Sequence, residues 1–113
     1  RSESREDETL FEGVTKRTLL IGKEVTLAEI RYNAFSSSTT HRHPDEHLGY
    51  VITGKLSYNS KRLSATLRAG DVFFTPAMQP HSIKALEDSL VIEACSSSSW
   101  RVIQKTQEWG RCR

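Results

Sequence analysis

Short segments of β-forming residues, separated by turn residues, dominate the chain from residue 17 onward. They are rich in Val, Ile, Leu, Thr, Tyr and Phe, and Gly, Asn, Asp, Ser or Pro separate them. No part of this region shows a sustained apolar repeat with the 3.6-residue period of a helix. We therefore predict strands near residues 17–21, 25–34, 47–53, 55–59, 63–68, 72–75, 81–86 and 89–95.

This alternation of short strands and turns predicts an all-β protein, built as an antiparallel sandwich, barrel or jelly roll. Closing such a sheet removes its exposed edges. The 113 residues are enough for one domain, which at this size buries roughly two-thirds of the surface of its unfolded chain. Because an eight-stranded barrel is wide enough to hold one small ligand, we expect function to lie inside it.

The two ends of the chain differ from this central part. Residues 1–9, "RSESREDET", are almost wholly polar, so we expect a loose tail or a frayed helix there. We assign 1–16 to an N-terminal tail or swapped strand, 17–96 to the barrel, and 97–113 to a C-terminal extension packing on the barrel. The segment "WRVIQKTQEW" in that extension fits either a strand or a helix.

Charge and composition exclude several classes of protein. The 16 basic and 14 acidic residues are spread along the chain and give a net charge of +2, so we expect no nucleic-acid partner. No apolar run reaches the roughly 18 residues of a membrane helix. Cys95 and Cys112 are too few for a disulfide framework or a Cys-rich zinc site. We expect a reduced, soluble, cytoplasmic protein.

Three of the four histidines lie within seven positions, in "HRHPDEHLGYVITG". His41 and His43 are two residues apart, so on an extended segment they point to the same side. His47 has the same parity if the strand resumes after Pro44, and together with the distant His81 these imidazoles can converge on a metal ion. Taken singly, a His-x-His pair is also compatible with a surface feature, and a lone histidine with a satisfied or exposed side chain.

The spacing around the first three histidines resembles the first motif of the cupin superfamily. That motif is Gly, five residues, His-x-His, three or four residues, Glu, six residues, Gly. Here His41, His43, position 47 and Gly54 match the spacing, and Phe35 stands in place of the leading Gly.

A second cupin motif surrounds the fourth histidine. Its pattern is Gly, five residues, Pro-x-Gly, two residues, His, three residues, Asn. Gly70, Pro76 and His81 fit it, while Met78 replaces Gly and Ala85 replaces Asn. The resemblance covers residues 17–96 and implies a small jelly-roll (double-stranded β-helix) barrel, in agreement with the predicted strands.

The resemblance also implies a metal site. His47 stands at the family's carboxylate ligand position, and "HPDEHLGYV" is similar to small single-domain metal-binding cupins that read "HPHEQIGYV", among them cupins that linearise ketouronates. Carried over by position, the ligands are His41, His43, His47 and His81, around one divalent transition metal ion (Fe, Ni, Zn, Cu, Co or Mn). Four neutral imidazoles leave the ion's charge uncompensated, which favours an anionic or enolate-forming substrate.

Glu46, Tyr50 and Glu93 are candidate catalytic groups, and Arg31 is a candidate anion contact. Glu46, next to His47, fits a general base or a carboxylate outside the ligand shell. Tyr50 fits packing or a hydrogen-bonding role. Glu93 and Arg31 would supply a proton acceptor and an anion contact if the strand phase turns them inward, although charged residues are more often at the surface.

The function that follows is a metal-dependent enzyme for a small organic acid, sugar acid or enolisable carbonyl compound. The motif resemblance favours isomerase or lyase chemistry, with dioxygenase or decarboxylase chemistry as alternatives on the same site. A non-catalytic ligand-binding or sensing module is the other class, because no unambiguous general base stands beside the histidines. The expected partners are a small anionic substrate and a second copy of the chain, since resembling cupins commonly form dimers.

Overall fold

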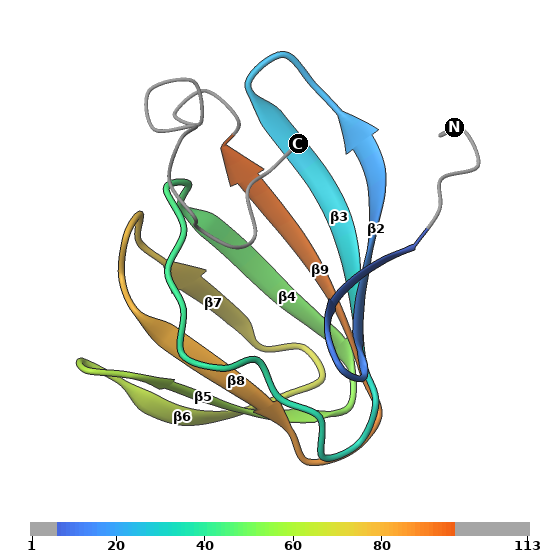
Figure 1. Ribbon diagram of the computed structural model, residues 1–113, viewed down its shortest axis with the longest axis vertical. Coiled ribbons are helices and arrows are strands. Elements are labelled where there is room, and N and C mark those ends of the chain that lie inside the picture. Colours follow the sequence, from blue (N-terminus) through green and yellow to red (C-terminus); the bar gives the residue numbers. More distant parts are fainter. Residues whose placement is uncertain (1–6, 97–113) are drawn as a thin grey trace.

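The computed structural model describes residues 7–96, which form two facing antiparallel sheets (Figure 1). The strands are β1 (Glu8–Phe11), β2 (Val14–Ile21), β3 (Val25–Tyr32), β4 (His47–Thr53), β5 (Lys55–Ser60), β6 (Ser64–Arg68), β7 (Val72–Thr75), β8 (His81–Ala85) and β9 (Ser89–Ser96). One sheet has the order β1-β2-β3-β9-β4-β7 and the other β6-β5-β8. The described part of the chain contains no helix, and the predicted all-β jelly-roll class is confirmed.

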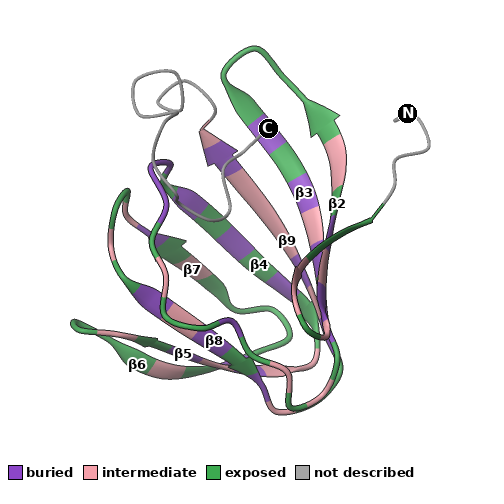
Figure 2. Ribbon diagram, in the orientation of Figure 1, coloured by how far each residue is buried: buried purple, intermediate pink, exposed green. Residues whose placement is uncertain are grey.

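The core lies between the two sheets, where the inward residues of each strand are buried (Figure 2). In β3 every second residue from Thr26 to Tyr32 is buried, as the two-residue period of a strand requires. The hydrophobic cluster also contains members of β2, β4, β5, β6, β8 and β9: Val14, Val51, Leu56, Tyr58, Leu67, Ile83, Ala85 and Val91. One continuous apolar core therefore holds the two sheets together.

The order of the strands brings two distant loops to the same end of the sandwich. After β4 the chain crosses to the small sheet as β5 and β6, returns as β7, crosses again as β8, and finishes as β9 between β3 and β4. The β3–β4 loop, residues 33–46, therefore meets the short β7–β8 loop, residues 76–80. These loops carry the two histidine motifs.

Each predicted strand has a counterpart within a few residues, and the bounds of β4 and β7 match the prediction. The sheet starts earlier than the sequence suggested: β1 and the first residues of β2 lie within 1–16, the segment assigned to a tail or swapped strand. β1 pairs with β2 of the same chain. The predicted C-terminal extension, 97–113, lies outside the described residues.

Two observations bear on the expected cellular setting. Cys95 is buried at the end of β9 and takes part in a disulfide, so its thiol is not in the expected reduced form. Disulfides are typical of oxidising compartments, and the cytoplasmic location stays a prediction. Among residues 7–96 no helix is long and apolar enough to cross a membrane.

Candidate metal centre

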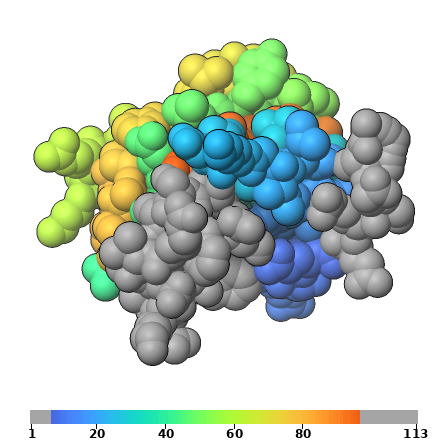
Figure 3. Space-filling view, turned by 90° about the horizontal axis from the view of Figure 1, so that it is seen from above, coloured from blue at the N-terminus to red at the C-terminus, as the bar shows by residue number. Residues whose placement is uncertain are grey.

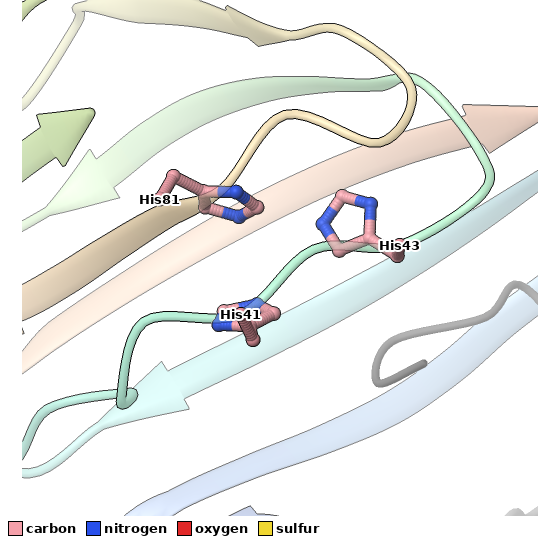
Figure 4. Close-up of side chains that lie close together, drawn as sticks. All are labelled: His41, His43 and His81. Carbon is pink, nitrogen blue, oxygen red and sulfur yellow. The ribbon is translucent and has the colours of Figure 1, made fainter. Parts of the chain in front are cut away.

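Three of the four predicted ligands form one cluster (Figure 4). His41 and His43 come from the β3–β4 loop and His81 is the first residue of β8. One ring nitrogen from each lies within 4.8 Å of the others. The spacing of the motifs thus corresponds to a real convergence of side chains from two segments about 40 residues apart.

Backbone hydrogen bonds fix the two histidine segments against each other. The N–H of His41 donates to the carbonyl of His81, and the N–H of His81 donates back to the carbonyl of His41, each at 2.9 Å. The N–H of Met78 donates to the carbonyl of His43 at 2.7 Å. The relative positions of the three rings are therefore set by the main chain rather than by side-chain packing alone.

The tautomer of each clustered histidine is fixed by a backbone carbonyl. Nδ1 of His41, His43 and His81 lies 2.8, 3.0 and 2.8 Å, respectively, from a carbonyl oxygen two residues away along the chain. Because a carbonyl only accepts hydrogen bonds, each Nδ1 carries the proton and donates it. Each Nε2 keeps its lone pair, which is the form that binds a metal ion.

Burial keeps the clustered imidazoles neutral. Loss of solvation, reinforced by the neighbouring His47 and His81, lowers the pKa of His43 to about 2. Burial is also the main cause that lowers the pKa of His41 and of His81, against the opposing effect of their carbonyl hydrogen bonds. All three rings are therefore neutral at neutral pH, with one N–H each, as metal ligation requires.

The fourth histidine, His47, pairs with a carboxylate beside the cluster. It is the first residue of β4, and its Nδ1 lies 2.9 Å from Oε1 of Glu93 on β9. Its ring stacks on His43 with centroids 3.9 Å apart and an interplanar angle of 15°. His47 is not in the group of three mutually close nitrogens, so its role as a fourth ligand stays a prediction.

Glu93 is the one predicted catalytic residue that faces the site. Burial raises the pKa of Glu93, but the hydrogen bond from His47, the charge of His47 and the charge of Lys16 outweigh it, so the pKa is below its usual range. The carboxylate is therefore ionised at neutral pH. An ionised carboxylate bonded to Nδ1–H is the usual way to orient a metal-ligating imidazole.

A cavity of 40 Å³ opens onto this cluster and is lined by all four histidines and by Glu93. Three residues that carry a hydroxyl group also line the cavity: Tyr32, Ser38 and Thr75. Burial, with a smaller effect from the charge of Glu93, raises the pKa of Tyr32 well above its usual value, so this phenol is a hydrogen-bond donor at neutral pH. The sequence analysis did not identify these three residues. The alternation of side chains along β3 could have indicated Tyr32, which is on the inward face of that strand.

The other predicted site residues lie away from the cavity. Glu46 is exposed. Tyr50 is 46% exposed and points away from the core, since His47, Gly49 and Val51 occupy the inward positions of β4. Arg31 is exposed and pairs with Glu29 at 3.5 Å. The residues that line the cavity therefore include none of Glu46, Tyr50 and Arg31.

The donor set fits a divalent transition metal ion. Three neutral imidazole nitrogens with fixed orientation suit Fe, Ni, Zn, Cu or Co, whereas Mg and Ca prefer oxygen ligands. His41, His43 and His81 would hold the ion, and His47 has the orienting carboxylate that a fourth ligand would need. The cluster can hold a metal, and it does not by itself choose among these ions.

Comparison with known proteins assigns the family. Residues 28–94 match the family model of the cupin domain, which covers more than half of the chain. The chain belongs to the cupin family. No match was found among curated proteins.

Solved structures show the same fold. A similar structure is an RmlC-like cupin from Shewanella frigidimarina, with a TM-score of 0.74, 24% identity, and coverage of 81% of this chain and 83% of that one. KdgF from a Halomonas species has a TM-score of 0.73 and 25% identity, covering 80% and 84%. The polyketide cyclase RemF from Streptomyces resistomycificus has a TM-score of 0.73 and 18% identity, covering 85% and 78%.

Proposed function

We propose that this cupin is a metal-dependent enzyme that moves a proton on a small enolisable carbonyl compound. The observation that carries the proposal is the cluster of His41, His43 and His81, each with its Nε2 lone pair free, next to the hydrogen-bonded His47 and Glu93. A ligand-binding module would need the histidines. It would not need an ionised carboxylate inside the same cavity.

Different residues bind the metal ion and transfer the proton. A bound divalent ion supplies Lewis-acid polarisation of a carbonyl oxygen. His47 would be the fourth ligand, because Glu93 holds its Nδ1–H and leaves its Nε2 lone pair for the ion. Glu93 also lines the cavity, so its carboxylate accepts the proton from the carbon next to the carbonyl and returns it to a neighbouring atom, which is an isomerisation.

Two comparisons support isomerase or lyase chemistry over the alternatives. The run from His43 to Val51 resembles the cupins that read "HPHEQIGYV", a group that includes ketouronate-linearising proteins. KdgF shares the fold over most of both chains. The choice of isomerase or lyase chemistry rests on these two likenesses together with the position of Glu93.

Metal content tests the ligand assignment. Protein purified without an affinity tag is analysed for bound metal beside His41→Ala and His81→Ala, with Lys61→Ala, an exposed change in the β5–β6 turn, as control. We expect close to one ion per chain in the wild type and in the control, and at least tenfold weaker binding in each histidine variant. Equal metal content in all four proteins would overturn the site.

The variant Glu93→Gln separates binding from proton transfer. Its amide oxygen still accepts a hydrogen bond from His47 Nδ1–H, but it does not take up a proton. We expect metal affinity within a few-fold of the wild type, and a loss of roughly 10²–10⁴ in turnover of ketouronates or other enolisable carbonyl compounds. Turnover that survives this substitution, or that persists in chelated protein, would contradict the proposed mechanism.

A further inference from the structure

The outer face of the three-stranded sheet is polar throughout. Side chains alternate along a strand, and buried residues such as Leu56 and Leu67 turn toward the large sheet, so their neighbours face away from it. Three of the outward residues are the cations Lys55, Arg68 and Lys84, and the others carry a hydroxyl or an amide group. Within β5, β6 and β8 this face has no carboxylate and no apolar side chain.

The cations of this face belong to a charge asymmetry in the whole chain. Of the 16 basic and 14 acidic residues, residues 47–86 contain five basic ones and one acidic one, Asp71, which is a net charge of +4. The other 11 basic and 13 acidic residues give the rest of the chain a net charge of −2. Lys61 and Arg62 are exposed in the β5–β6 turn, which projects in yellow-green at the left border of Figure 3. Positive charge is therefore concentrated on the small sheet and its turn.

None of the five cations of this region forms an ion pair within residues 7–96. By contrast, Arg17 of β2 pairs with Asp7 at 2.9 Å. The carboxylate of Asp71 accepts the backbone N–H of Arg68 at 2.7 Å. Glu87 and Asp88 lie beyond β8, in the turn to β9. The cations on the outer face of the small sheet are thus left to solvent or to a ligand.

Two of these cations face each other across neighbouring strands. Lys55 on β5 is directly opposite Arg68 on β6, and like charges in this position destabilise a sheet. Local rules of this kind are broken mainly at functional sites. An anion bound between the two side chains would replace their repulsion by two charge-assisted hydrogen bonds.

A chain of hydrogen bonds orients the uncharged groups of the same face. The hydroxyl of Ser64 donates to Oδ1 of Asn59, and Nδ2 of Asn59 donates to Oγ of Ser57, each at 3.1 Å. Ser57 accepts in this chain, so its own hydroxyl proton is left to donate to a ligand. Ser57 lies between Thr66 on β6 and Lys84 on β8. This row of donors lies next to the row formed by Lys55 and Arg68.

Donors and cations on an open sheet fit a ligand that has many acceptor oxygens and spaced negative charges. The bases of single-stranded nucleic acids stack on aromatic side chains, and the outward face of these three strands has none. Nor does it have the apolar side chains that enter a membrane surface. Hydroxyl and amide groups outnumber the cations, which fits a ligand whose hydroxyls outnumber its charges.

We propose that the outer face of the three-stranded sheet binds a carboxylate-bearing polysaccharide. Lys55, Arg68 and Lys84 contact its carboxylates, and Ser57 and Thr66 donate to its hydroxyls. Exposed ion pairs are individually weak, so the affinity comes from several contacts made along one polymer. The face lies on the opposite side of the small sheet from the histidine cavity, and the inference does not depend on the proposed function.

Two polymers with the same backbone test the role of the carboxylates. Carboxymethyl-dextran and dextran are titrated calorimetrically into chelated protein at about 50 mM and about 300 mM NaCl, between which screening of exposed charges increases. We expect carboxymethyl-dextran to bind at least tenfold more tightly than dextran at the lower salt concentration, and to lose at least tenfold in affinity at the higher one. Equal binding of the two polymers, or no binding of either, would overturn the inference.

Matched double variants separate a specific face from general charge attraction. Arg68→Ser with Lys84→Ser removes two exposed cations from the face, and Arg17→Ser with Lys23→Ser removes two exposed cations from the region of β2. We expect the first pair to weaken binding of carboxymethyl-dextran at least fivefold and the second by less than twofold. Equal losses in the two double variants would show that only net charge matters and would overturn the site.

An uncharged variant tests the hydrogen-bonding part of the face. Ser57→Ala keeps every charge, and we expect it to weaken binding of carboxymethyl-dextran about two- to fivefold, because one donor of the row is lost. Unchanged affinity in this variant would overturn the proposed contacts, also where the double variant fails to fold. Tighter binding of oligo(dT) or of phosphatidylserine vesicles than of carboxymethyl-dextran at the same salt concentration would assign the face to another class of partner and overturn the proposal.

Discussion

Phe35 and Met78 show how individual residues keep the geometry of the site. Both have positive φ angles, 70° and 64°, and both stand where the cupin motifs carry glycine. The left-handed conformation costs a residue with a Cβ roughly 1–2 kcal/mol. The chain retains the motif's turns without the motif's residues, and at Met78 the turn supplies the hydrogen bond to the carbonyl of His43.

Replacing Phe35 tests this strain. Its side chain is 73% exposed, so little packing is lost on substitution. We expect Phe35→Gly to have a free energy of unfolding about 1 kcal/mol higher than Phe35→Ala, because only Gly adopts this φ without a steric penalty. Urea denaturation of the two variants measures the difference. An alanine variant as stable as the glycine variant would contradict the prediction.

At the scale of single elements, β4 depends on a close approach that only glycine permits. A Cβ on Gly49 would lie 2.2 Å from Cζ of Phe73 on the neighbouring β7. Phe73 also lines the cavity, so its ring links the packing of β4 to the shape of the site. The "HLGYV" run of the motif therefore has a steric reason for its glycine.

Gly49→Ala is expected to displace the Phe73 ring and to lower the free energy of unfolding by about 1–3 kcal/mol, the usual cost of overpacking. Denaturant unfolding measures the loss. The double variant Gly49→Ala, Phe73→Leu makes room for the methyl group and should recover part of the stability, while Phe73→Leu alone should not stabilise. Additive effects of the two substitutions would show that the contact is not the cause.

Some features of the strands can be predicted from the sequence, and others cannot. The two-residue period and the turn residues predicted eight strands, but β1, "ETLF", borders the polar N-terminal stretch and carries no comparable signal. Side chains alternate along β4, so Tyr50 lies on the opposite face of the sheet from His47, and the exposure of Tyr50 can be predicted from the sequence. The hydrogen bond between His47 and Glu93 cannot be predicted in this way, because it depends on which strand pairs with β4.

At the scale of the whole molecule, buried neutral histidines link stability to pH. In the metal-free protein the pKa of His43 is about 2, against about 6.5 in an unfolded chain. Between these values the unfolded state binds a proton that the folded state does not, so stability falls as the pH falls. The lowered pKa values of His41, His81 and Glu93 act in the same direction.

We therefore expect the chelated protein to lose stability steadily from pH 7 to pH 4, with His43 contributing up to about 1.4 kcal/mol per pH unit. Urea denaturation at a series of pH values measures this slope. The variant His43→Asn removes the titrating group, so its profile should be shallower than that of the wild type. A profile that is flat, or equally steep in both proteins, would contradict the assignment.

The paired hydrogen bonds between His41 and His81 have a consequence for how a metal ion is acquired. They close a loop of about 40 residues, and the entropy lost in that closure is offset by the strand pairing of the whole sandwich. The three clustered histidines are thus in place without an ion, unlike the ligands of small zinc domains that fold only around their metal. If the proposed ion binds, it would bind to a folded protein, and we expect that it could be removed and replaced by a different ion without unfolding.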